Sequence, residues 1–120
     1  MLESAALLSL VERTGTDILT IVEGLSEEEF FRSRLTRQEV RRQVCLLAST
    51  LAGAPPLLRE RLPELAWNDW ARTALILGDG ADAAQERLAL WQALNVLVVE
   101  TLSWLRVHRE SQPELFAFAP

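Results

Sequence analysis

The sequence predicts an all-α protein, a bundle of three long helices with two or three short ones. Apolar residues recur at steps of three and four along most of the chain, which places them on one face of a helix. No run of five residues alternates cleanly between apolar and polar side chains with turn signals at both ends, so no strand is predicted. With 120 residues, 49% of them hydrophobic, the chain suits a single helical domain over residues 1–110 and an apolar tail over 111–120.

The first long helix is expected over Ser4–Gly24, because glycine is a common stop signal. Its inner stripe consists of Leu7, Val11, Thr14, Ile18, Ile21 and Leu25. A short helix over Glu27–Arg32 should follow, since Ser26 and Glu29 have the spacing of a capping box.

The second long helix is expected to begin at a further capping box, formed by Thr36 and Glu39, and to end near Gly53. Its inner face consists of Val40, Val44, Leu47, Ala48 and Leu51. A short helical turn should cover Leu57–Leu62, and Pro63 is expected at the first position of a helix that runs to Leu77. The residues of that helix expected to face inward are Leu65, Trp70, Ala71, Ala74 and Leu77.

The last long helix is expected over Ala83–Glu110, after the break at Gly78-Asp79-Gly80 and with Asp82 or Gly80 as its cap. Its inner stripe is predicted to be Leu88, Trp91, Leu94, Val98, Leu102 and Leu105. A second apolar side, formed by Leu90, Leu97 and Trp104, places this helix at the centre of the bundle or at an interface.

The last helix and the tail each have one further notable feature. Three polar residues, Gln92, Asn95 and Glu100, interrupt the most apolar stretch and argue against a membrane span. Phe116 and Phe118 in the tail are unusual choices for a freely solvated segment.

The composition excludes several kinds of chemistry. All 12 basic residues are arginine, so Schiff-base and P-loop lysines are absent. Cys45 is the single cysteine and His108 the single histidine, which excludes an intrachain disulfide, multi-cysteine zinc sites and two-histidine metal motifs. We therefore expect neither a metal nor a cofactor. The acidic start lacks the basic region of a signal peptide and the lone cysteine fits a reducing compartment, so a cytoplasmic location is expected.

An arginine-rich segment, residues 32–42, carries five arginines and one glutamate in a chain whose net charge is −5. Arg37, Arg41 and Arg42 are candidate contacts to RNA phosphates or to a protein partner, because guanidinium groups bind phosphate through paired hydrogen bonds. No aromatic residue lies among these arginines to stack on bases. A solvated or salt-bridged helix face, with Glu39 paired to a nearby arginine, is therefore the favoured interpretation.

Three other constellations have a structural and a functional interpretation. Arg72 and Asp79 lie near a helix end and form a possible degenerate site. Cys45 and His108 have the residue types of a thiolate dyad, but a packed cysteine and a histidine at a helix terminus are favoured. Four tryptophans have the residue type that lines an aromatic pocket, although packing in the core or at an interface is favoured. They are Trp67, Trp70, Trp91 and Trp104.

Three segments in order resemble the HepT-like family of the HEPN superfamily of small helical proteins. They are Glu23–Phe30, Leu35–Val40 and Leu58–Trp67, and Trp91 falls where the family tends to have a tryptophan early in its last helix. The resemblance covers about residues 17–107 without gaps. It implies a dimeric helical bundle encoded beside a minimal nucleotidyltransferase, in which the helical protein is an RNA-cleaving toxin that the nucleotidyltransferase neutralises.

The family's active motif is an arginine and a histidine separated by four to six residues, with a tyrosine two places further on. The ungapped match places Ala74, Asp79 and Ala81 at these three positions, and a register that starts from Arg72 also reaches no histidine. The family's Gly-Glu-Ala element is replaced by Ala48-Ser49-Thr50. The resemblance therefore implies a degenerate, non-catalytic member that acts through protein–protein interaction, as a homodimer and with a nucleotidyltransferase-type partner. The alternative is an RNA-binding protein, or a residual ribonuclease, that uses the arginine segment.

Overall fold

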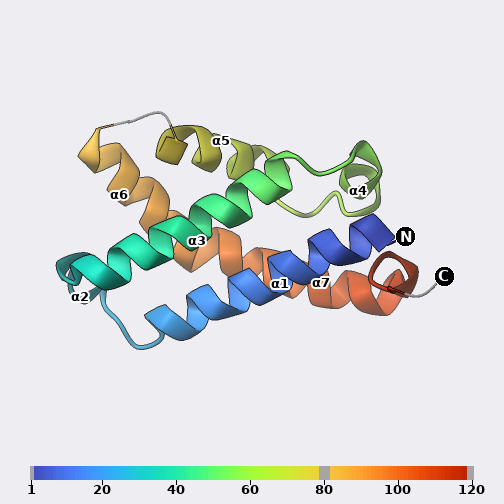
Figure 1. Cartoon of the computed structure of the whole chain (residues 1–120), viewed down its shortest axis with the longest axis horizontal. Helices are drawn as coiled ribbons and strands as arrows, with labels where there is room; N and C mark the ends of the chain where they lie inside the picture. The colour runs from blue at the N-terminus through green and yellow to red at the C-terminus, as the bar shows by residue number, and fades with distance from the viewer. Residues whose placement is uncertain (1, 79–81, 119–120) are drawn as a thin grey trace.

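The computed structural model describes residues 2–78 and 82–118, and this part of the chain is entirely α-helices, turns and short helical segments, as predicted. Three long helices form the bundle: α1 (Leu2–Val22), α3 (Arg34–Ala52) and a continuous last helix over Ala83–Ser111. Short helices connect them: α2 (Glu27–Arg32), α4 (Pro56–Arg61) and α5 (Trp67–Gly78). Figure 1 shows α1, α3 and α7 running side by side along the long axis, with α5 and α6 at one edge.

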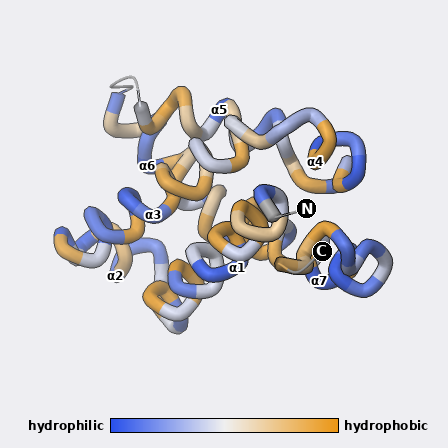
Figure 2. The backbone as a smooth tube through the Cα atoms, turned by 45° about the vertical axis from the view of Figure 1, so that its right-hand side comes forward, coloured by the Kyte–Doolittle hydropathy of each residue, from blue (hydrophilic) through white to orange (hydrophobic). Residues whose placement is uncertain are grey.

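The core lies between α1, α3 and the last helix. Every residue predicted for the inner face of α3 is buried, and the α1 positions Val11, Thr14 and Ile18 are buried as predicted. The prediction is less accurate at both ends of the α1 stripe. At the N-terminal end Leu8 is fully buried and the predicted Leu7 lies at the edge of the core, and at the C-terminal end the predicted Ile21 is exposed. Figure 2 shows that hydrophobic and hydrophilic residues alternate along the turns of these helices.

The connection from α1 to α2 forms as the sequence predicts. Gly24 has a φ of +79°, a left-handed conformation that glycine adopts without steric cost. The capping box is present, because the Ser26 side chain accepts from the Glu29 N–H and the Glu29 carboxylate accepts from the Ser26 N–H. These two hydrogen bonds hold the acidic first turn of α2, where the helix dipole favours negative charge.

The predicted start of α3 is wrong by one turn. The helix begins at Arg34 and its cap is Ser33, whose Oγ accepts from the Thr36 N–H. Thr36 therefore occupies the third helical position, and Glu39 takes no part in the cap. Ser33 also ends α2, and this shared residue leaves no room for a separate linker before α3.

The predicted helix start at Pro63 is also wrong, because α5 begins four residues later at Trp67. Residues 62–66 form a turn that buries Leu62 and Leu65. The Trp67 Nε1 donates to the Leu62 carbonyl at 2.9 Å and closes this turn. Burial of both leucines therefore outweighs the preference of Pro63 for a first helical position.

The last helix consists of α6 (Ala83–Gln92), a π-helical turn (Ala93–Leu97) and α7 (Val98–Ser111), and Asp82 caps it as predicted. Leu94, Val98 and Leu105 are buried as predicted, but Leu88 is 71% exposed. A π turn holds an extra residue, so a stripe counted in α-helical steps does not continue correctly through it. On α6 the buried positions are Ala89 and Leu90, and Ala93 is buried at the start of the π turn.

The C-terminal segment packs onto the end of the bundle. A 3₁₀ turn over Pro113–Leu115 buries Leu115 completely, and Phe116 is nearly buried beneath the guanidinium of Arg109, 4.6 Å from its ring centre. Phe118 is exposed. The predicted tail thus supplies two core residues, and one of the two phenylalanines has a packing role.

The last helix has the length and the apolar composition of a membrane span. However, 44% of its most apolar window is buried inside the molecule, and the core helix of a bundle has the same properties.

Candidate functional site

The arginine-rich segment lies on α2 and the first half of α3, and two of its side chains are tied to neighbouring elements. Arg37 donates to the carbonyl of Phe31 at 2.8 Å. Arg41 donates to the Glu86 carboxylate at 2.7 Å through Nε and to the carbonyl of Leu77 at 2.6 Å. Arg41 therefore links α3 to the end of α5 and the start of α6.

Arg42 lies on a different side of α3 and pairs along its own helix. Its guanidinium donates to both carboxylate oxygens of Glu39, at 3.1 and 2.6 Å, as the spacing of the two residues predicts. These hydrogen bonds from Arg42, with one from Gln43, lower the pKa of Glu39 to about 2. The structure thus brings Arg37 and Arg41 to one cavity, while Arg42 lines a separate shallow groove beside Cys45.

The second candidate pair has one member that can be placed. Arg72 lies on the exposed side of α5, where its guanidinium is 3.3 Å from the carboxylate of Asp69. Asp79 lies outside the described residues. An ion pair on the surface of α5 therefore accounts for Arg72 without a functional role.

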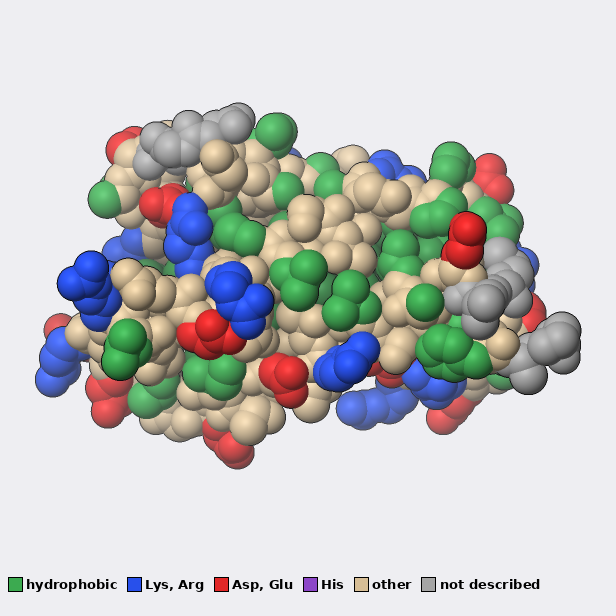
Figure 3. All heavy atoms as spheres, viewed as in Figure 1, with side chains coloured by type: hydrophobic (Ala, Val, Ile, Leu, Met, Phe, Trp, Pro, Cys, Tyr) green, Lys and Arg blue, Asp and Glu red, His purple; other side chains and the backbone are tan. Residues whose placement is uncertain are grey.

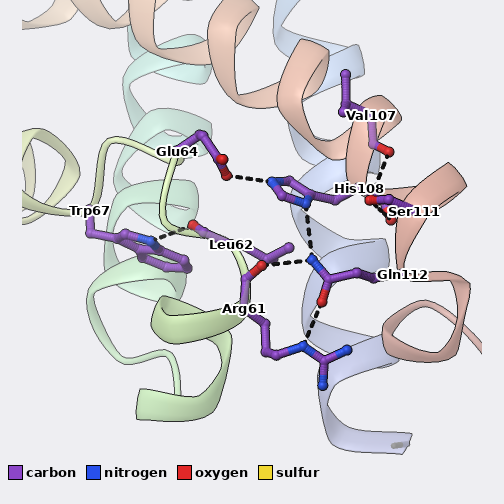
Figure 4. Close-up of polar contacts among 8 residues, drawn as sticks. All are labelled: Arg61, Leu62, Glu64, Trp67, Val107, His108, Ser111 and Gln112. Atoms are coloured by element: carbon purple, nitrogen blue, oxygen red, sulfur yellow. Dashed lines mark hydrogen bonds and ion pairs between the residues drawn. The ribbon is translucent and has the colours of Figure 1, made fainter.

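His108 is nearly buried, and its contacts explain why it lies at the end of α7. Its Nε2 is 2.6 Å from Oε1 of Glu64, and its Nδ1 is 3.1 Å from the side-chain amide nitrogen of Gln112 (Figure 4). Gln112 also donates to the carbonyl of Arg61 at 2.7 Å and accepts from Nε of Arg61 at 2.5 Å. Figure 4 shows these groups bridging α7 and the segment between α4 and α5.

The other member of the suspected dyad has different surroundings. Cys45 is half-buried on α3, and burial raises the pKa of its thiol, which favours the unreactive protonated form. It lines a groove with Arg42, Leu46 and Ala74, whereas His108 bonds Glu64 and Gln112. Packing explains the cysteine, and a hydrogen-bond network explains the histidine.

The four tryptophans lie at separate places in the bundle. Trp70 is fully buried and donates to Oγ1 of Thr101 at 3.0 Å. Trp91 packs against the rings of Phe30 and Phe31, each 6.0 Å away between centroids. Trp67 closes the turn before α5, and Trp104 is partly exposed on α7. Core and surface packing accounts for them.

An apolar surface runs along the outer side of the last helix. We define this α7 face as Val96, Val99, Trp104 and Val107, each of which is more than a third exposed. Beside it, a groove of about 550 Å³ lies between the last helix and α1. Its lining includes the apolar residues Leu19, Val22 and Leu102 and the polar residues Glu23, Asn95 and Arg106. The sequence indicated apolar residues on both sides of this helix, but only the structure separates the buried side from the exposed one.

Two functional arrangements have no signal in the sequence. Glu64 lies 44 residues from His108, and Arg87 lies far along the chain from Phe31, whose ring its guanidinium covers at 4.1 Å. Helix periodicity reports which face is apolar and does not report which polar groups meet across the bundle.

The described residues define the class as an all-α helical bundle. The chain matches no family model, no curated protein and no solved structure at a significant level.

Proposed function

We propose that this chain is a non-catalytic, HepT-like helical protein of the HEPN superfamily that acts through protein–protein contacts. In this proposal two copies associate in the cytoplasm, and the assembly binds a partner of the minimal nucleotidyltransferase class in a toxin–antitoxin-like pair. In this proposal the chain has the helical bundle of the family but not its ribonuclease activity. The three positions of the family's active motif hold Ala74, Asp79 and Ala81 instead of arginine, histidine and tyrosine.

The observation that carries the proposal is the α7 face. Val96, Val99 and Val107 recur at near-helical spacing on a helix whose opposite side is already buried in the core. An exposed apolar stripe of this kind next to a groove is typical of a protein interface. The groove beside it, lined by Leu102 of α7 and Leu19 of α1, offers a hollow for an apolar side chain of a partner.

Sedimentation at tens of micromolar protein tests the self-association. We expect a dimer for the wild type and a monomer for Val99→Asp, because a carboxylate in a buried apolar contact is strongly unfavourable. Leu35→Asp is the matched control, since Leu35 is 80% exposed on α3, away from the α7 face, and should leave the dimer intact. Two results together would refute the proposal: the wild type sediments as a monomer, and a pull-down with the product of the neighbouring gene recovers no nucleotidyltransferase.

RNA binding by the arginine segment is the second candidate. Of the three candidate arginines, Arg42 is exposed and Arg37 and Arg41 are half-buried, and accessible guanidinium groups attract phosphates. The two candidates differ in their dependence on salt. RNA binding should weaken steeply between low and physiological salt, whereas an apolar dimer should not.

A further inference from the structure

A cavity of about 370 Å³ opens where α2, the start of α3, the end of α5 and the start of α6 meet. Its floor is apolar, since Leu77 and Leu90 are each only 3% exposed, and the ring of Phe31 contributes to its wall. The volume lies in the range of pockets that hold small organic molecules. The cavity is distinct from the α7 face and does not depend on the function proposed above.

The charges around this cavity are unusual for the chain. Arg37, Arg41 and Arg87 line it with one carboxylate, Glu86, so the described lining residues have a formal charge of +2 in a protein whose net charge is −5. Figure 3 shows basic side chains gathered at this end of the molecule, on both the lobe with α2 and α3 and the lobe with α5 and α6. The positive charge is therefore concentrated beside an apolar floor.

One of the three guanidinium groups, that of Arg37, has no carboxylate partner among the described residues. Arg37 is fixed by the Phe31 carbonyl, which is a dipole and leaves the positive charge uncompensated. Arg87 lies over the Phe31 ring and forms a loose ion pair with Glu27, at 3.4 Å from Nε and 3.5 Å from the second nitrogen, with both side chains half-exposed. Arg41, by contrast, is closely paired with Glu86. Groups that are already positioned lose less conformational entropy when a ligand binds.

We propose that this cavity binds a small organic anion, with its carboxylate or phosphate held by Arg37 and Arg87 and a compact apolar body against Leu77 and Leu90. The planar guanidinium group donates paired hydrogen bonds to either kind of head group. The apolar floor adds the free energy of burying the ligand's body, so an anion without such a body should bind less tightly. The shared requirement is thus one negative head group and an apolar body of about one ring.

Titration of the full-length, ¹⁵N-labelled protein with four probes tests this proposal. The probes are phenyl phosphate, benzoate, inorganic phosphate and benzyl alcohol. We expect saturable shifts of the Arg37 and Arg87 Nε signals and of the Leu77 and Leu90 amides. At least one of the two organic anions should bind about tenfold more tightly than inorganic phosphate and benzyl alcohol. Comparison of the affinities of phenyl phosphate and benzoate shows which head group the cavity prefers. The proposal is overturned if inorganic phosphate binds as tightly as both organic anions, or if no probe gives saturable shifts.

Variants separate a built cavity from general attraction of anions. Ala83 is exposed in the first turn of α6 and lines the cavity, so Ala83→Trp should fill it and abolish the saturable shifts without loss of helical circular dichroism. Arg37→Gln should weaken binding about tenfold. Arg106→Gln is the matched control, because Arg106 lies on α7 beside the groove with α1 and away from the cavity. Wild-type binding by Ala83→Trp, or equal losses in Arg37→Gln and Arg106→Gln, would contradict the assignment.

Discussion

Nε2 of His108 lies 2.6 Å from Oε1 of Glu64, and this contact joins the last turn of α7 to the turn that precedes α5. The side-chain amide nitrogen of Gln112 faces the other ring nitrogen. An amide nitrogen is only a donor, so Nδ1 must accept and the ring proton of neutral His108 is on Nε2, where it donates to the carboxylate. The single histidine of the chain is thus part of a network that joins two distant segments.

This network predicts the tautomer of His108. Long-range ¹H–¹⁵N spectra of the neutral imidazole should show the Nε2–H form for the wild type. Gln112→Ala removes the donor to Nδ1 and both bonds to Arg61, so the tautomer preference should weaken and unfolding free energy should fall by about 1–3 kcal/mol. An Nδ1–H ring in the wild type would show that the Gln112 amide has the opposite orientation.

The same contact predicts a pH dependence of stability. Hydrogen bonds from its own backbone N–H and from His108 lower the pKa of Glu64. A lowered pKa in the folded state stabilises the protein above the unfolded value of about 4.3, and this contribution disappears as the pH falls through the folded value. Glu64→Gln should therefore be less stable than the wild type near neutral pH, and the two should converge as the pH falls through the lowered pKa of Glu64 in the folded state. Urea titrations across this range measure the difference, and a gap that widens on acidification would have the wrong sign.

The buried pair of Trp70 and Thr101 provides a test of the core. The Trp70 indole donates its N–H to Oγ1 of Thr101 at 3.0 Å, with both residues buried. Thr101→Val keeps the shape but leaves a buried donor unpaired, which should cost about 1–3 kcal/mol of unfolding free energy. Thr101→Ser retains the hydroxyl acceptor and loses only the γ-methyl group, so it is the matched control. If Thr101→Val is as stable as the wild type in urea titrations, the hydrogen bond contributes nothing.

The inner face of α3 was predicted correctly from the sequence, whereas the first turn of the same helix was not. The buried positions Val40 and Leu47 are determined by helical periodicity, which is a local property. Ser33 and Thr36 are both good caps, and the choice between them depends on where α2 ends in space. The π turn and the Glu64–His108 contact likewise depend on packing between distant segments. For the candidate sites, the sequence identified Arg37 and Arg41 but could not place Arg87 beside them.

The cap of α3 gives a direct test of this difference. Ser33→Ala removes the side-chain acceptor of the Thr36 N–H and should lower the unfolding free energy by about 1 kcal/mol. Glu39→Ala, which would remove the acceptor if Thr36 and Glu39 formed the capping box, should leave the start of the helix unchanged. Hydrogen exchange of the Thr36 amide distinguishes the two, with faster exchange expected in Ser33→Ala alone. Faster exchange in Glu39→Ala would instead favour the cap that the sequence predicts.

Gly24 determines how the chain leaves α1. Its φ of +79° places it in the left-handed region, and a Cβ built there meets no atom within 4 Å. Gly24→Ala should therefore destabilise the protein by about 1–2 kcal/mol through backbone strain alone. Gly24→Asn should cost less, because asparagine tolerates this conformation better than alanine. Urea titrations of the two variants measure both values, and an alanine variant as stable as the wild type would mean that the α1–α2 connection relaxes to another conformation.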